Sequence, residues 1–157
     1  MPKGNFIVPV PRNETVLSYA PGSDEKRKLK EALSTAKSET REILMNIGGR
    51  SVKTDDRRTI HPPHEHGHLL GNYYQGDKTH IAQAIDAALV AKKSWENMPA
   101  EERAAIFLKA ADLIGGRYRS TINAATMLGQ SKNAYQAEID AAIDRFEDEE
   151  ELDDDED

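Results

Sequence analysis

Cysteine is absent from the 157 residues of this sequence. Its absence excludes disulfides, zinc ribbons, iron–sulfur ligation and a thiolate nucleophile within these residues. Long hydrophobic runs are absent too: one of the longest, residues 104–108, is far shorter than the roughly 20 residues that span a bilayer, so we expect a soluble chain. The first fourteen residues include three prolines and one acidic residue, which fits no targeting sequence. The expected location is the cytoplasm, or the mitochondrial matrix if the source is a eukaryote.

Charge is divided unevenly along the chain. The formal net charge is −7, but residues 144–157 alone carry 11 acidic residues and one arginine, which leaves the rest of the chain at +3. A dense run of like charges repels itself, so we expect a disordered acidic tail over 147–157. The nearly neutral body and the acidic tail predict no nucleic-acid partner and no membrane partner.

Patterns that mark common catalytic sites are also missing. The glycine pairs at 48–49 and 115–116 match neither the dinucleotide-binding pattern nor the P-loop pattern, and no G-x-S-x-G element is present. The carboxylates of Glu138 and Asp140 lie two residues apart and therefore on different faces of a helix. The residues by themselves predict no catalytic constellation.

Hydrophobic spacing predicts an α+β fold that is predominantly helical. An amino-terminal arm and a few short strands should be followed by about four helices. We divide the chain into an extended arm (1–22), short helix and strand elements (23–78), a helical part (79–146) and the acidic tail (147–157).

The second of these segments combines one helix with short strands. Ser23 can cap a helix that runs through residue 37. Short apolar alternations on both sides of Gly48 and Gly49 predict a hairpin, and a third strand is expected around residues 66–74.

The third segment should contain the remaining helices. Thr79 is a suitable N-cap for the first, Pro99 fits the first turn of the second, and the glycine pair at 115–116 should end it. A further helix is expected over 117–128, and Ser131 can cap the last one.

Three histidines suggest a metal site. If residues 64–68 form a strand, His64, His66 and His68 point to one side and could hold Zn²⁺ or Ni²⁺. The competing interpretation, which we favour, is half-exposed strand and turn histidines, because the sequence offers no fourth ligand or supporting second shell.

Four stretches carry a more specific signal. They are NETVLSYAPGS at 13–23, IGGRSVKT at 47–54, HPPHEHGHLLGNYYQGDKTHIAQAIDAAL at 61–89 and RAAIFLKAADLIGGRYRSTINAATMLGQSKNAYQAEIDAA at 103–142. Together they resemble the amino-terminal region of the Δ1-pyrroline-5-carboxylate dehydrogenases, a branch of the aldehyde dehydrogenase superfamily.

The resemblance implies an NAD-dependent oxidation of glutamate γ-semialdehyde to glutamate in proline catabolism. In that family a cysteine attacks the aldehyde and a glutamate activates water, but both residues and the Rossmann sheet lie further along a much longer chain. This sequence then resembles an incomplete NAD domain that lacks its Rossmann sheet. We expect a fragment without catalytic activity and without a cofactor of its own.

One site residue follows from the same resemblance. A glutamate in the QAEIDA motif borders the aldehyde pocket in the family, so Glu138 is the residue expected near substrate. The competing interpretation, which we favour, is a solvated helix carboxylate, because the catalytic part is missing.

The resemblance also raises the question of partners. In the family the corresponding helices pack on the NAD domain, whose central sheet is missing here. Their apolar side chains must therefore pack together, find a partner or stay exposed. These side chains belong to Ile85, Leu89, Trp95, Phe107, Leu113, Ile114, Ile139 and Phe146. We therefore expect a fragile fold. A second hypothesis is an interaction or oligomerisation module that associates with itself or with a full-length aldehyde dehydrogenase.

Overall fold

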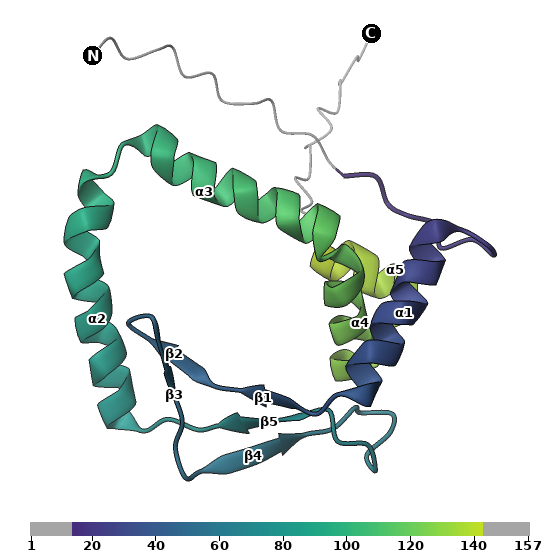
Figure 1. Ribbon diagram of the computed structural model, residues 1–157, viewed down its shortest axis with the longest axis horizontal. Helices are drawn as coiled ribbons and strands as arrows, with labels where there is room; N and C mark the ends of the chain where they lie inside the picture. Colours follow the sequence, from purple (N-terminus) through teal and green to yellow (C-terminus); the bar gives the residue numbers. More distant parts are fainter. Residues whose placement is uncertain (1–13, 143–157) are drawn as a thin grey trace, which may run out of the picture.

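The computed structural model describes residues 14–142, and Figure 1 shows their path as an open ring. Its helices are α1 (Asp24–Ser38), α2 (Lys78–Asn97), α3 (Ala100–Asp112), α4 (Arg119–Gln130) and α5 (Ala134–Ala137), with π-helical turns at η1 (Leu113–Arg117) and η2 (Glu138–Ala142). Its strands are β1 (Arg41–Ile43), β2 (Met45–Ile47), β3 (Arg50–Val52), β4 (Arg57–Ile60) and β5 (Gly71–Tyr74). The predominantly helical α+β prediction is confirmed.

Helix α1 forms as its sequence predicts. The Ser23 hydroxyl accepts a hydrogen bond from the Lys26 amide at 3.3 Å, and Asp24 and Glu25 occupy the first turn. The helix lies along α4, and the core between them contains Tyr19, Leu29 and Ala124. This pair of helices is the best-packed part of the described chain.

A small mixed sheet lies beneath these helices in the view of Figure 1. Strand β5 is central, parallel to β1 and antiparallel to β4. Gly71 lies opposite Arg41, and a Cβ atom at Gly71 would come within 2.6 Å of the Arg41 carbonyl oxygen. Glycine is therefore what allows this close approach of the two strands.

The hairpin predicted at the first glycine pair is confirmed. Strands β2 and β3 pair in antiparallel register, and the φ angles of Gly48 and Gly49 are 59° and 76°. Positive φ at both central residues is what a tight hairpin turn needs, and glycine adopts it without strain. The strand expected over 66–74 is shorter than predicted and covers only β5.

Helix α2 begins earlier than the sequence suggested. Its N-cap is Asp77 and not Thr79, and the Asp77 carboxylate accepts hydrogen bonds from the amides of Thr79 at 2.9 Å and His80 at 3.1 Å. Pro99 is the N-cap of α3, so that helix starts one residue after it. Aspartate prevails over threonine because its carboxylate reaches two free amides of the first turn.

Two further boundaries differ from prediction. The glycine pair at 115–116 was expected to end the second helix of this segment. Instead both glycines lie inside the π-helical turn η1, which joins α3 to α4. Ser131 adopts a left-handed conformation, with φ of 57°, and ends α4. The N-cap of α5 is Asn133, which exchanges hydrogen bonds with Gln136 in a capping box.

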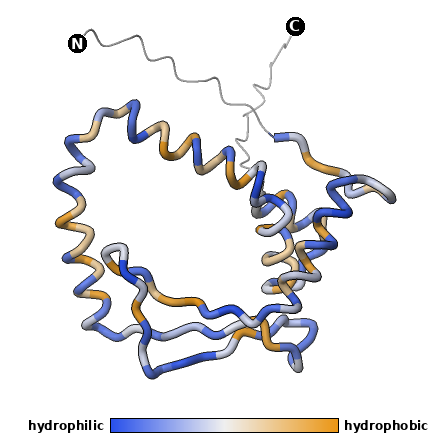
Figure 2. The backbone as a smooth tube through the Cα atoms, in the orientation of Figure 1, coloured by the Kyte–Doolittle hydropathy of each residue, from blue (hydrophilic) through white to orange (hydrophobic). Residues whose placement is uncertain are grey.

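Helices α2 and α3 form a segment that we call the arch, residues 78–112. Within the arch no residue is buried, and Figure 2 shows apolar positions along both helices. The rings of Trp95 and Phe107 meet edge to face, with centroids 6.3 Å apart, where one helix turns into the other. Among the described residues, no helix is both long and apolar enough to cross a membrane.

The ends of the sequence carry predictions that fall outside the described residues. These are the first thirteen residues of the expected arm, the helical extension to Phe146, and the acidic tail over 147–157.

Candidate functional site

Glu138 lies at the junction between α5 and η2, and its side chain is fully buried. The interpretation of Glu138 as a solvated helix carboxylate is therefore wrong. A buried ionised carboxylate needs several hydrogen bonds to compensate for lost hydration, so its surroundings are the first place to look for a site.

The Glu138 carboxylate accepts hydrogen bonds from four residues. Its Oε1 atom accepts from the Leu17 amide at 2.9 Å and from Nη2 of Arg119. Its Oε2 atom accepts from the Tyr19 hydroxyl at 2.6 Å, from Nδ2 of Asn123 at 2.6 Å and from Nε of Arg119 at 3.2 Å. We call Glu138, Arg119, Asn123 and Tyr19 the buried network.

The buried network fixes residues 14–19, which we call the strap, to the helices. Arg119 donates from Nη2 to the Thr15 carbonyl oxygen at 2.7 Å and lies 3.5 Å from the Glu14 carboxylate. The strap is irregular, so its amides and carbonyls need partners outside any strand or helix. The network supplies partners for the Leu17 amide and the Thr15 carbonyl oxygen, and so joins segments more than 100 residues apart in the sequence.

Tyr19 shows how firmly the strap is held. Its φ of 51° places a bulky residue in the left-handed region, which costs about 1–2 kcal/mol. Its hydroxyl donates to Glu138 and accepts from Asn123 Nδ2 at 2.8 Å, while its ring packs in the core beside Leu29. Core packing and buried hydrogen bonds together offset the strain.

The ionisation of the buried network follows from these contacts. Burial alone raises the pKa of Glu138, but hydrogen bonds from Arg119, Tyr19, the Leu17 amide and Asn123 outweigh it and lower the pKa below its usual value. Burial, together with the neighbouring Glu138 carboxylate, raises the pKa of Tyr19 to about 12. At neutral pH Glu138 is charged and Tyr19 is protonated.

This arrangement limits what Glu138 can do chemically. Two carboxylate oxygens offer about four lone-pair positions, and five hydrogen bonds already point at them. A charged, fully hydrogen-bonded and buried carboxylate with a lowered pKa is a poor proton acceptor. In this conformation it acts as a fixed anion, and its nearness to a substrate stays a prediction.

The three candidate histidines do not lie on a strand. His64, His66 and His68 fall in turns before β5, so the one-sided arrangement on which the metal-site hypothesis depended is wrong. Nδ1 of His64 lies 2.8 Å from the Ser131 hydroxyl, and the His68 carbonyl oxygen accepts from His61 at 2.8 Å. Across residues 14–142 no three histidine or acidic side chains gather in a way that could hold a metal ion.

Sequence reasoning identified Glu138 but not its partners. Arg119 and Asn123 are four residues apart, so both face the same side of α4, and that spacing is visible in the sequence. Tyr19 lies 119 residues from Glu138, and no local pattern links the two.

Comparison with known proteins gives a consistent result. Residues 50–152 match the aldehyde dehydrogenase family. The chain is 47% identical over 138 residues to the Δ1-pyrroline-5-carboxylate dehydrogenase of Agaricus bisporus, covering 87% of this chain and 25% of that protein. It is 43% identical over 130 residues to the mitochondrial enzyme of Rattus norvegicus, covering 83% of this chain and 23% of the relative.

Solved structures agree with the sequence relatives. The crystal structure of the Mycobacterium tuberculosis Δ-pyrroline-5-carboxylate dehydrogenase bound with NAD superposes with a TM-score of 0.86 at 44% identity, covering 88% of this chain and 26% of that one. The chain thus spans about a quarter of the length of the relatives that it matches. It belongs to the aldehyde dehydrogenase family, as a partial homologue of Δ1-pyrroline-5-carboxylate dehydrogenase.

Proposed function

We propose that this chain supplies a non-catalytic part of a Δ1-pyrroline-5-carboxylate dehydrogenase, the enzyme that oxidises glutamate γ-semialdehyde to glutamate with NAD in proline catabolism. The observation that carries the proposal is the match of nearly the whole described fold, at 44% identity, to about a quarter of such an enzyme. These 157 residues have no cysteine to form the thiohemiacetal, so by themselves they are catalytically silent.

The exposed apolar side chains of the arch support the proposal that this chain packs against another part of the enzyme. Ile81, Ile85, Leu89 and Val90 are all at least half exposed on α2, although they would gain free energy by leaving water. A soluble domain rarely leaves such a stripe uncovered unless another surface packs on it. The catalytic part of the enzyme is the partner we propose.

The cofactor belongs to that partner in our proposal. The described sheet has three short strands in mixed orientation, and the sequence has no glycine-rich phosphate-binding pattern. The M. tuberculosis relative was crystallised with NAD bound, so its whole chain forms an NAD site. This chain alone should bind NAD no better than an unrelated protein.

Reconstitution tests the proposal directly. The purified chain, given NAD and pyrroline-5-carboxylate, should produce no NADH. Mixed with the M. tuberculosis dehydrogenase from which the matching quarter has been deleted, it should restore measurable NADH production, because the missing helices are supplied in trans.

A matched pair of variants assigns the docking surface. Ile85→Ser combined with Leu89→Ser removes two apolar side chains from one face of α2 and should lower the restored rate at least tenfold. Gln83→Ser, at an exposed position on another face of the same helix, should leave it unchanged. NADH formation by the chain alone, or a failure to restore activity in any mixture, would contradict the proposal.

A second candidate function is self-association through the same exposed side chains. Sedimentation velocity on the reconstitution samples separates the two. A dimer that the Ile85→Ser/Leu89→Ser variant breaks, with no restored activity in the mixtures, would establish an oligomerisation module. A monomeric chain that restores activity in the mixtures would exclude self-association as its function.

For location we propose the cytoplasm or, in a eukaryotic source, the mitochondrial matrix, where the rat relative is placed by name. Immunolocalisation in the source cells tests this, and a signal outside both compartments would contradict it.

A further inference from the structure

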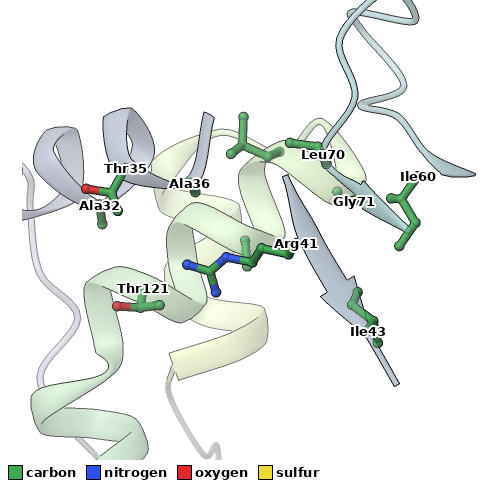
Figure 3. Close-up of a pocket in the computed structure, with 12 residues that line it drawn as sticks. Ala32, Thr35, Ala36, Arg41, Ile43, Ile60, Leu70, Gly71 and Thr121 are labelled. Carbon is green, nitrogen blue, oxygen red and sulfur yellow. The ribbon is translucent and has the colours of Figure 1, made fainter. Parts of the chain in front are cut away.

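A cleft of about 300 Å³ lies between the helix pair and the sheet, away from the buried network. Helices α1 and α4 form one side, and strands β1 and β4 with the residues around Gly71 form the other (Figure 3). The cleft is at the small end of the size range of ligand-binding pockets.

Most of the lining is hydrocarbon. The apolar wall comes from Ala32, Ala36, Ile43, Ile60, Leu70 and Leu128. Water in a cleft of this kind finds few hydrogen-bond partners, so an apolar chain that replaces it is favoured. The volume is about twice that of an apolar cavity able to hold benzene, which leaves space for a ligand on the order of ten heavy atoms.

One cation is present in this apolar lining. The side chain of Arg41 lies among the lining residues in Figure 3, and no acidic residue lines the cleft with it. The ion pair of Arg41 with Glu39 is long, at 3.5 Å, and both side chains are more than half exposed, so it occupies little of the guanidinium's capacity. Its backbone is fixed, because its amide donates to the Leu70 carbonyl oxygen at 3.0 Å.

Two hydroxyls complete the polar side of the cleft. Thr35 on α1 and Thr121 on α4 both line it.

We propose that this cleft binds a small monocarboxylate with an unbranched apolar chain. The hydrocarbon chain lies against the alanine, isoleucine and leucine side chains, and the carboxylate pairs with the Arg41 guanidinium. The size, the apolar lining and a single positive charge with no acidic residue in the lining all select for this class of ligand over a diacid, a cation or a neutral polar molecule.

Octanoate is a suitable probe because it has ten heavy atoms and one carboxylate. Titrated into the full chain, it should bind saturably with a 1:1 stoichiometry by calorimetry, and it should shift amide resonances of α1, α4 and β1. Octanol should bind about fivefold more weakly, because it lacks the charge that pairs with Arg41. Acetate should show no saturable binding, because it lacks the chain.

Variants separate the two contributions. Arg41→Gln should weaken octanoate about fivefold and leave octanol unchanged, while Arg50→Gln, an exposed arginine on β3, should alter neither. Ala36→Leu should fill part of the cleft and abolish binding of both probes without lowering the helical circular dichroism signal.

Several outcomes would overturn the assignment: no saturable octanoate binding, equal binding of octanoate by the Arg41→Gln variant, or release of octanoate when the catalytic part of a relative is added. The last result would show that a protein segment of the catalytic part, and not a small carboxylate, occupies the cleft. The inference does not depend on the proposed function, so failed reconstitution would leave it standing, and failed binding would leave the reconstitution result intact.

Discussion

The helix pair α1–α4 and the arch both consist of helices with apolar side chains, but they differ in what covers those side chains. Leu29 on α1 is 4% exposed, whereas Leu89 on α2 is 58% exposed. The pair shares a core, and the buried network fastens the strap across it. The arch touches the rest of the described fold mainly at the β2–β3 hairpin and at η1. An amphipathic pattern therefore specifies a helix and an apolar face, but not whether this chain itself covers that face.

The buried network gives the largest expected effect. Glu138→Gln removes the charge that pairs with Arg119 and should lower the free energy of unfolding by about 3 kcal/mol, measured by urea denaturation. Asp140→Asn is the control, because Asp140 lies in the same π-helical turn but is exposed, and the expected change is within about 0.5 kcal/mol.

The same variant has a pH signature. Because folding lowers the pKa of Glu138, its contribution to stability is present above its unfolded pKa of about 4.5 and is lost as pH falls through the folded pKa. The Glu138→Gln protein should lose less stability on acidification than the parent. Equal acid sensitivity in both, or equal costs for Glu138→Gln and Asp140→Asn, would contradict a stabilising role for the network.

Identical substitutions in the two regions sharpen the comparison. Leu29→Ala should cost about 3 kcal/mol because it leaves a cavity in the shared core. Leu89→Ala should change the free energy of unfolding by no more than about 0.5 kcal/mol, because the side chain is already in water. Chemical denaturation followed by circular dichroism measures both. Equal losses would show that the arch is covered in solution, for instance by a second copy of the chain.

Tyr19→Phe should produce the smallest of the three effects at neutral pH. The variant loses one hydrogen bond to Glu138, at a cost of about 1 kcal/mol, while the ring stays in the core. Tyr135→Phe, at an exposed position on α5, should be neutral.

The pH dependence of Tyr19 has the opposite direction to that of Glu138. Burial raises the pKa of Tyr19 from 10.0 to about 12, so the folded state retains a proton that the unfolded state releases. That stability is fully present below pH 10 and is lost as pH rises through about 12. Thermal unfolding between these pH values should decline more steeply for the parent than for Tyr19→Phe. Parallel curves would show that the hydroxyl is not buried beside the carboxylate.

Much of the local structure could be predicted from the sequence. The Ser23 cap and the positive φ of Gly48 and Gly49 depend on residues within a few positions of each other, and the structure confirms both. Boundaries were missed where two local signals competed, as when Asp77 capped α2 in place of Thr79. Strands β1 and β4 were not predicted, because each is three or four largely exposed residues and depends on β5 for its hydrogen bonds.

The candidate site also combines a feature visible in the local sequence with features that depend on distant contacts. The sequence identified Glu138 through its motif, but the expected solvation was wrong because burial depends on Arg119, Asn123 and the distant Tyr19. Likewise, the metal-site hypothesis required the three histidines to share one face of a strand, whereas the chain turns between them.

By itself, the sequence determined the helical character, the main hairpin, the lack of a thiol nucleophile and the family resemblance, since each depends on residue identity or short-range spacing. Only the tertiary structure decided that Glu138 is a buried anion, that Arg41 lines an apolar cleft and that no residue within 14–142 buries the side chains of the arch. The physical reason is that burial and charge pairing depend on which distant segments come together, and a desolvated charge is stable only where its partners converge.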